Sequence, residues 1–413
     1  MPPFLPYGRQ TIDEDDIAAV VAALSSDFLT CGPEVETFER EVADMVGAKH
    51  AVAVCNATAA LHLAMLVAGI GRGHRVVTSP NTFLASANCA AYVGAIPDFC
   101  DIDPVSYNMD PEKLEECWKP DTKAVVAVDY AGQPCAMPSI ARIARAKGAL
   151  VIEDACHGPG GGFHFEGKNW KLGGHPWADM TVFSFHPVKT ITTGEGGILV
   201  TDNDEYARRA RLLRSHGMER DHGRFHAFGQ LGHPLSEAGP WAYEMQELGY
   251  NYRITDLQCA LGRSQLKKLS AFIRRRQEIV ASYNEAFANI PWLKTPAVSE
   301  AGVQKAESKS QVSGFSFQLS DLSLHLYTVQ IDFPSLGRTR SDVMTTLRQQ
   351  GIGSQVLYIP VYLQPWYRQT YGYTPGKCPK AESFYAQALS LPFYPALSDE
   401  EVQRVIQVVH SLA

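Results

Sequence analysis

The chain has 413 residues, of which 45% are hydrophobic and 20% charged, and its formal net charge is -7. This length suits two domains, or one large domain with an appendage. The longest basic run has three residues, and no apolar run approaches the roughly 20 residues that span a bilayer. We therefore expect a cytoplasmic protein that binds neither nucleic acid nor membrane.

The cysteine pattern argues against disulfide bonds and against a metal site. There are nine, and no two have the C-x-x-C spacing. An odd, unpatterned set is typical of reduced thiols in a cytoplasmic protein. The same lack of pattern argues against a metal site, and we expect none.

Two helices are predicted near the N-terminus. Thr11 and Glu14 fit a capping box for the first, which carries an apolar stripe of Ile17, Val21 and Leu24. The segment PEVETFEREVADMVG reads as the second, with proline near its first turn and glycine at its end.

Strands and helices then alternate as far as residue 154. The predicted strands are HAVAVC, HRVVTSP, IPDFCDID, KAVVAVD and ALVIED, with a helical segment between each pair. DMTVF and ILV, on either side of a polar turn further on, read as two more buried strands. Apolar strands that alternate with helices predict an α/β fold with a mostly parallel sheet covered on both faces.

The pattern changes after about residue 255. A long helical stretch begins at TDLQCALG, and the rest contains one clear strand candidate, LHLYTVQIDF, and two helices. We therefore predict a large α/β domain over residues 1–265 and a smaller α+β domain over residues 266–413.

Unusual polar residues follow the predicted strands. Ala57 and Thr58 open a helix directly after the first strand, where their backbone N–H groups and the threonine hydroxyl could cradle a phosphate. The alternative is an ordinary helix cap by Asn56. Phe83, after the next strand, is either a core residue or a flat cover over a planar ligand.

Two carboxylates end the strand ALVIED. Glu153 and Asp154 point to opposite faces of the strand, so only one of them can enter a given site. Taken alone, Asp154 is equally compatible with a structural and a chemical role.

A lone lysine lies in a polar turn between two buried strands. Lys189 is the only lysine of SFHPVKTITTGEGG, whose glycines permit close backbone approach. Burial would lower the pKa of its amine and make it a nucleophile. A phosphate cradle, a ring cover, a strand-end aspartate and such a lysine are together what pyridoxal 5'-phosphate needs.

These stretches resemble the DegT/DnrJ family of pyridoxal-phosphate-dependent sugar aminotransferases. The resemblance runs over nearly the whole chain through FLTCGPEVETFE, NATAALHLA, NTFLASAN, IEDACH, SFHPVKTITTGEGG, LGYNYRITDLQCALG and YIPVYLQPWY. It implies fold type I, the aspartate-aminotransferase-like fold, and a homodimer with shared active sites. The branch it most resembles acts on a UDP-linked 4-keto-6-deoxy-N-acetylhexosamine in pseudaminic acid biosynthesis.

The resemblance also implies roles for individual residues. Lys189 would form the Schiff base and shuttle protons, Asp154 would bond the pyridine nitrogen, and Asn251 would reach the phosphate from the second subunit. The implied cofactor-binding residues are Ala57, Thr58, Phe83, Asp154, His157, Ser184, Lys189 and Asn251.

For the substrate, the resemblance implies a nucleotide-linked ketosugar and an amino donor, with glutamate expected. The candidate substrate-binding residues are Thr30, Tyr358 and Tyr362. The chain departs from the family pattern at Asp129, at Leu357 and Tyr362, and in a long glycine-rich segment, residues 157–177. These departures affect the expected sugar more than the cofactor.

Three other functions stay open on the sequence. The enzyme could transfer the amino group to C3 of the sugar rather than C4, or it could be a sugar dehydratase of the same fold. Such dehydratases carry histidine in place of the Schiff-base lysine, so Lys189 argues against that alternative. A non-catalytic regulator built on the same scaffold is disfavoured because Lys189, Asp154 and Asn251 are all present.

Overall fold

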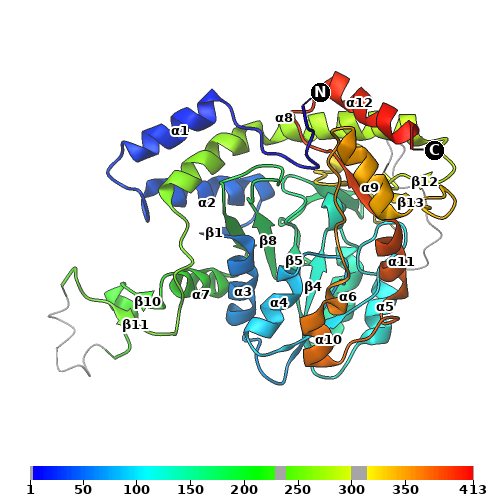
Figure 1. Ribbon diagram of the computed structural model, residues 1–413. Coiled ribbons are helices and arrows are strands. Elements are labelled where there is room, and N and C mark those ends of the chain that lie inside the picture. Colours follow the sequence, from blue (N-terminus) through cyan, green and yellow to red (C-terminus); the bar gives the residue numbers. More distant parts are fainter. Residues whose placement is uncertain (1–2, 228–238, 299–313, 413) are drawn as a thin grey trace.

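A seven-stranded sheet forms the centre of the molecule in a computed structural model that describes residues 3–227, 239–298 and 314–412 (Figure 1). The strands, in spatial order, are β1 (His50–Val54), β9 (Gly197–Thr201), β8 (Met180–Ser184), β5 (Leu150–Asp154), β4 (Thr122–Val128), β2 (Arg75–Thr78) and β3 (Ile96–Phe99). Strand β9 runs antiparallel to both of its neighbours, and the remaining pairs are parallel. The predicted mostly parallel sheet is confirmed.

Helices cover both faces of this sheet, as the continuous apolar strands require. One face packs against α3 (Ala57–Val67), α4 (Ala85–Tyr92) and α7 (Asp204–Arg214). The other face packs against α2 (Pro33–Val46), α5 (Pro111–Cys117) and α6 (Met137–Ala146).

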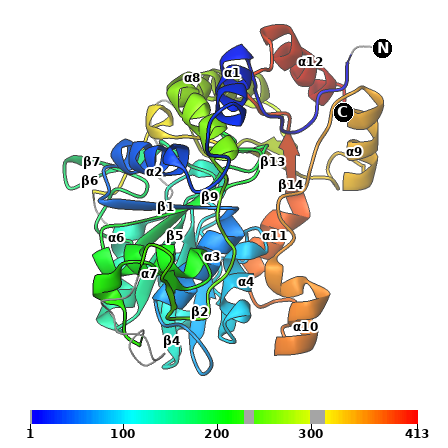
Figure 2. The same ribbon diagram turned by 90° about the vertical axis from the view of Figure 1, so that its left-hand side faces the viewer.

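The C-terminal part is built on a second, three-stranded antiparallel sheet. Its strands are β12 (Leu293–Lys294), β13 (Tyr327–Ile331) and β14 (Ala388–Leu391). The helices of this part are α9 (Arg340–Gln349), α10 (Pro365–Tyr371), α11 (Pro379–Gln387) and α12 (Asp399–His410). Figure 2 shows these elements beside the central sheet, on the side away from α7.

A 32-residue helix, α8 (Asp256–Phe287), connects the two parts. Thr255 caps it and forms a capping box with Gln258. The predicted domain boundary at residue 265 falls inside this helix, and one apolar core runs from α2 through α8 to α12. The division into 1–265 and 266–413 stays a prediction.

The cap of the first helix, α1 (Glu14–Leu24), lies two residues later than predicted. Asp13, not Thr11, accepts from the backbone of Asp16 and forms the capping box with it. The predicted apolar stripe exists, but it faces outward: Ile17, Val21 and Leu24 are each more than half exposed. An apolar helix face of this kind on a folded protein is a mark of an interaction surface.

Two short strands of a ribbon, β10 (Met218–Glu219) and β11 (Glu244–Met245), project from the body beyond α7 (Figure 1). The ribbon is joined to the body through residues 246–255, which carry the GYNYR motif.

The glycine-rich segment 157–177 folds as a packed hairpin of β6 (Gly162–Phe165) and β7 (Lys168–Lys171). Its glycines permit close approach, since a Cβ on Gly174 would lie 1.8 Å from the carbonyl oxygen of Val46. Phe163 contacts Phe315 of the C-terminal part, with ring centroids 5.1 Å apart. The segment therefore joins the two parts of the chain.

A buried hydrogen bond holds the end of this segment to the sheet. Nε2 of His175 lies 2.8 Å from Oε1 of Glu153, and both side chains are fully buried. Thr181 and the backbone of Gly173 also donate to the Glu153 carboxylate. Burial raises the pKa of Glu153, but these partners outweigh it and hold the pKa below its ordinary value.

We expect His175→Ala to lower the free energy of unfolding by about 3 kcal/mol, because it removes a hydrogen-bond partner from a buried carboxylate. Chemical denaturation at neutral pH measures this change. The matched control is Glu205→Gln, which breaks the exposed pair of Glu205 with Arg208 and should cost under about 1 kcal/mol. Equal losses in the two variants would contradict a stabilising role for the buried pair.

Candidate active site

A cavity of about 490 Å³ lies at the carboxyl ends of the central strands, where α/β folds bind ligands. Most of the residues predicted from the sequence meet there. The predicted residues that line it are Ala57, Thr58, Phe83, Asp154, His157, Ser184, Lys189 and Tyr358.

The N-terminus of α3 forms one end of the cavity. Asn56 caps the helix by accepting from the backbone of Ala59 at 2.8 Å. In the described part of the chain, the N–H groups of Ala57 and Thr58 have no acceptor, so both are available to an anion. The sequence left the helix cap and the anion cradle as alternatives. The two are compatible, because the cap uses the N–H of Ala59 and leaves those of Ala57 and Thr58.

A glycine of β9 lies directly beside this helix terminus. A Cβ on Gly197 would lie 2.4 Å from the backbone N of Ala57. Only glycine allows this close approach, which sets β9 against the start of α3.

Asp154 is the last residue of β5 and is almost fully buried. Its Oδ2 accepts a 2.6 Å hydrogen bond from the hydroxyl of Ser86, which is also 2.7 Å from the hydroxyl of Thr82. Its Oδ1 accepts from the backbone of Cys156 at 3.2 Å. These bonds fix the carboxylate at the floor of the cavity, while Glu153 points to the opposite face.

Lys189 lies in the turn between β8 and β9, where its backbone N–H donates to the carbonyl of His186 at 2.9 Å. Burial lowers the pKa of its ammonium group, against the opposing effects of Cys156 and Asp154. The amine is thereby made more available as a nucleophile, as the sequence led us to expect.

Phe83 is 56% exposed and lines the cavity, so the alternative that it is a core residue is wrong. It lies two residues before α4 rather than within it. Its ring centroid is 6.2 Å from that of Tyr358, which places two aromatic rings at the cavity mouth.

Two buried histidines also line the cavity. The ring centroids of His157 and His325 are 4.7 Å apart. Burial lowers the pKa of both imidazoles well below its ordinary value, and the charge of Lys189 lowers each further. Nδ1 of His325 is buried and has no hydrogen-bond partner among the described residues.

Tyr362 does not reach this cavity, which corrects its predicted place at the substrate. Its side chain is fully buried against Phe99 and Tyr373, and its hydroxyl bonds to Glu382. The aromatic contacts and the carboxylate of α11 turn it inward. Tyr358, four residues earlier, faces the cavity instead.

Only some of the other residues that depart from the family pattern lie at the cavity. Leu357 lines the cavity. Asp129 lies behind it, where its carboxylate accepts from the backbone of Cys135 at 2.8 Å. Burial, with the nearby charge of Glu153, raises the pKa of Asp129 well above its ordinary value. Of the described residues of 157–177, His157 alone lines the cavity.

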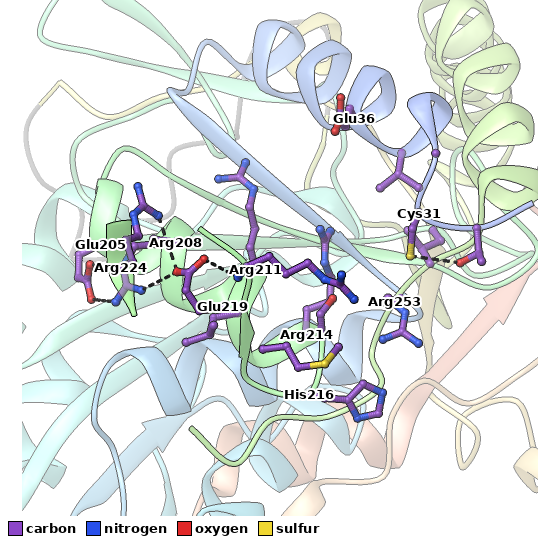
Figure 3. A pocket seen from close by; sticks show the side chains of 18 of the residues that line it. Cys31, Glu36, Glu205, Arg208, Arg211, Arg214, His216, Glu219, Arg224 and Arg253 are labelled. Atoms are coloured by element: carbon purple, nitrogen blue, oxygen red, sulfur yellow. Dashed lines mark hydrogen bonds and ion pairs between the residues drawn. The ribbon is translucent and has the colours of Figure 1, made fainter. Parts of the chain in front are cut away.

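Thr30 and Asn251 also lie outside this cavity. Thr30 lines a second cavity of about 1160 Å³, together with Arg253. Asn251 is exposed, beside Ser215, with which it forms a β-bridge. Figure 3 shows the side chains of the second cavity; its labelled arginines are Arg208, Arg211, Arg214, Arg224 and Arg253.

Most of these arginines have carboxylate partners. Arg208 pairs with Glu205 at 2.8 Å, and Arg214 pairs with Glu39 at 2.5 Å. Arg253 differs, since it forms no ion pair with any residue that the structure describes. Its guanidinium is therefore free to bind an anion.

Sequence reasoning missed several residues of the first cavity. Ser86 carries no motif of its own, and only the fold brings its hydroxyl to Asp154. Tyr7 comes from the N-terminal segment, and His325 precedes β13. No local pattern singled out His325, because several polar residues lie among the apolar ones of SLHLYTVQI.

Comparisons with known proteins agree with this geometry. Residues 10–410 match the DegT/DnrJ/EryC1/StrS aminotransferase family. The spore coat polysaccharide biosynthesis protein SpsC of Bacillus subtilis is 40% identical over 410 residues, which cover 99% of this chain and 97% of that protein.

Solved structures give the same result. PseC of Helicobacter pylori, an aminotransferase involved in the biosynthesis of pseudoaminic acid, superimposes with a TM-score of 0.83 at 29% identity and 99% coverage of both chains. The sugar aminotransferase Spr1654 of Streptococcus pneumoniae in its PLP form, described as putative, superimposes with a TM-score of 0.81 at 26% identity. That match covers 99% of this chain and all of that one.

The chain belongs to the DegT/DnrJ/EryC1/StrS aminotransferase family. It is a pyridoxal-phosphate-dependent sugar aminotransferase of fold type I, which confirms the predicted fold, enzyme class and cofactor. The free amides at α3, the buried Asp154 and the Lys189 amine fit this cofactor. In the described ranges there is no group of ligands that could hold a metal ion, and no helix long and apolar enough to cross a membrane.

The two buried histidines predict a dependence of stability on pH. Below about pH 6.5 their imidazoles take up protons in the unfolded chain but not in the folded one, so acid favours unfolding. Each histidine should remove about 1.4 kcal/mol of stability between pH 7.5 and 5.5. Urea unfolding of the holoenzyme measures the loss.

Carboxylates also make the free energy of unfolding depend on pH. Wild type is therefore compared with the double variant His157→Gln, His325→Gln, in which the carboxylates are unchanged. Wild type should lose about 2.8 kcal/mol more than this variant over the same interval. Parallel losses would mean that the imidazoles are not held neutral in the fold.

Proposed function

We propose that this enzyme transfers an amino group from glutamate to C4 of a nucleotide-linked 4-keto-6-deoxy sugar. The observation that carries the proposal is that the Lys189 amine, Asp154 and the α3 N-terminus line one cavity with Phe83 at its mouth. The likeness to PseC, an aminotransferase involved in the biosynthesis of pseudoaminic acid, supports a sugar substrate. The N-acetylated, UDP-linked type is what the sequence resemblance implies. A cytoplasmic location stays a prediction.

We assign the roles of the site residues by their chemistry. Pyridoxal phosphate, when bound, supplies an electron sink that stabilises negative charge at the carbon next to nitrogen. The amides of Ala57 and Thr58, with the Ser184 hydroxyl, would hold its phosphate. Asp154 would keep the ring nitrogen protonated, and Phe83 would cover the ring.

Lys189 would bind the cofactor covalently and then carry the proton. Its lowered pKa favours the free amine, which can accept a proton from the donor substrate. The same amine would return a proton to the amino product. His157 would lie near the cofactor's phenolic oxygen without donating to it, because its single N–H points to Tyr358.

The site is completed, in this proposal, by a second copy of the chain. Asn251 and Arg253 flank Tyr252, whose carbonyl accepts from the backbone of Cys55 next to the phosphate cradle. They lie outside the first cavity, and Arg253 and Thr30 line the second (Figure 3). The exposed apolar stripe of α1 gives such a dimer a surface to bury.

Within this dimer, Asn251 would contact the cofactor phosphate of the other subunit. Arg253 and Thr30 would face its substrate. A guanidinium without an ion pair suits the negative charge of a nucleotide diphosphate or a donor carboxylate.

Sodium borohydride reduction followed by peptide mapping should place the cofactor on Lys189, because reduction makes the link between lysine and cofactor permanent. The yellow colour of the purified protein should disappear with it. Lys168 and Lys171, on β7 and outside the cavity, serve as internal controls. Label on either of them would refute the assignment.

Mixing Asn251→Ala chains with Lys189→Ala chains in equal amounts should restore about a quarter of the sites, since half of random dimers are mixed and each has one intact site. Transamination activity and bound cofactor measure the recovery. If both variants are inactive alone and the mixture stays inactive, the sites are not shared.

With glutamate as donor, we expect amination at C4 of a UDP-linked 4-keto-6-deoxy-N-acetylhexosamine. In competition, a plain 6-deoxy ketosugar should react at least about tenfold more slowly, the effect of 1–3 kcal/mol for an unpaired buried polar group. NMR of the product locates the amine. An amine at C3, or equal turnover of both sugars, would count against the proposed substrate.

A further inference from the structure

Tyr358 belongs to a chain of hydrogen bonds with a defined direction. Its hydroxyl is 3.3 Å from Nε2 of His157, and Nδ1 of His157 is 3.1 Å from the backbone N of Ala131. A backbone N–H can only donate, so Nδ1 must accept. A neutral imidazole that accepts at Nδ1 carries its proton on Nε2 and donates that proton to Tyr358.

The direction of this chain does not change near neutral pH. Burial lowers the pKa of His157 well below its ordinary value, and the facing charge of Lys189 acts in the same sense. The ring of His325, also neutral, packs against His157. Burial raises the pKa of the Tyr358 hydroxyl, with Tyr130, Tyr7, Asp154 and Cys156 adding to the effect, so this group keeps its proton.

The same turn that orients His157 also orients the backbone beside Tyr358. The hydroxyl of Tyr130 donates to the carbonyl of Leu357 at 2.5 Å, and the backbone of Tyr130 is itself held by Asn108 at 2.8 Å. Both the ring and the main chain at Tyr358 are therefore positioned from residues 130–131.

This turn is fixed by its surroundings. Ala131 has a φ of 59°, and Gly132 has a φ of 92°. A Cβ on Gly132 would lie 2.2 Å from the carbonyl oxygen of Ser323, so only glycine fits there. The turn has no freedom to present a different donor to His157.

The hydrogen bond from His157 limits what the Tyr358 hydroxyl can offer to a ligand. Its oxygen already accepts from His157, so the hydroxyl has one proton to donate into the cavity that it lines. A ligand group that only accepts, such as an amide carbonyl, is satisfied by this donor. A sugar hydroxyl could accept the same proton, but it is a weaker acceptor than an amide carbonyl and brings no methyl group to pack against an apolar neighbour.

We propose that Tyr358 is a specificity-determining residue that donates to the amide carbonyl of an N-acetylated sugar, and that His157 is the positioning residue that holds it as a donor. The ring of Phe83, 6.2 Å from that of Tyr358, supplies an apolar neighbour for the acetyl methyl group. This inference rests on the proposed nucleotide-sugar substrate.

Binding of unreactive ligands to the holoenzyme tests it. UDP-N-acetylglucosamine and UDP-glucose differ in the acetamido group, and neither has a keto carbon to react. Isothermal titration should give wild type at least about a tenfold preference for the N-acetyl ligand. Tyr358→Phe should abolish this preference by weakening the N-acetyl ligand alone.

His157 has a conservative replacement that separates positioning from packing. Glutamine can accept from Ala131 through Oε1 and donate to Tyr358 through Nε2, so His157→Gln should keep the preference. His157→Leu, which can do neither, should lose most of it. The control Tyr385→Phe lies on α11 beside Arg340, outside the cavity, and should behave as wild type.

Each result decides the question. Equal affinity of wild type for the two ligands, equal weakening of both by Tyr358→Phe, or a preference that survives this change overturns the role of Tyr358. A preference unchanged in His157→Leu overturns the role of His157. Should Tyr358→Phe lose its cofactor absorbance or melt early, the pair His157→Gln and His157→Leu decides, because both variants keep the Tyr358 hydroxyl and only the first keeps its donor.

The proposed function would be refuted by different results: no cofactor label on Lys189 after borohydride reduction, or no amination of the ketosugar. A holoenzyme that aminates the ketosugar but shows no preference would refute this inference and leave that function standing.

Discussion

The pleat of β5 is the constraint on which the site depends. Glu153 and Asp154 are adjacent, and the strand sends their carboxylates to opposite faces. Glu153 enters the core and pairs with His175, which ties the 157–177 hairpin to the sheet. Asp154 enters the cavity, where Ser86 fixes it. One strand end thus sets both the packing of the hairpin and the floor of the active site.

The remaining groups meet Asp154 because parallel strands place their carboxyl ends at one edge of the sheet. Burial there has a uniform effect: it lowers the pKa of Lys189, His157 and His325, and so favours their neutral forms. Neutral nitrogen bases next to a fixed carboxylate suit a reaction that moves protons between carbon atoms. Neutral imidazoles also keep their hydrogen-bond direction, on which the proposed role of Tyr358 depends.

The segment around Tyr252 relates the two cavities. It contacts Cys55, beside the phosphate cradle of the first cavity, and it carries Arg253 into the second. The exposed apolar stripe of α1 is the feature of the surface that supports the proposed dimer, because a second copy would bury it.

The sequence by itself determined the fold class and the cofactor. Strand periodicity is local, and the residues proposed to hold the cofactor, Lys189, Asp154, Ala57 and Thr58, lie in contiguous motifs next to strand ends. It could not choose between Tyr358 and Tyr362, which share one irregular segment. Only the tertiary structure decided which of the two faces the cavity, because contacts distant in sequence orient both side chains. Tyr362 bonds to Glu382 and is buried in the core. Tyr358 is held at the cavity by His157, and the carbonyl before it by Tyr130. The pairing of Ser86 with Asp154 is likewise tertiary, because 68 residues separate the two groups and no local pattern joins them.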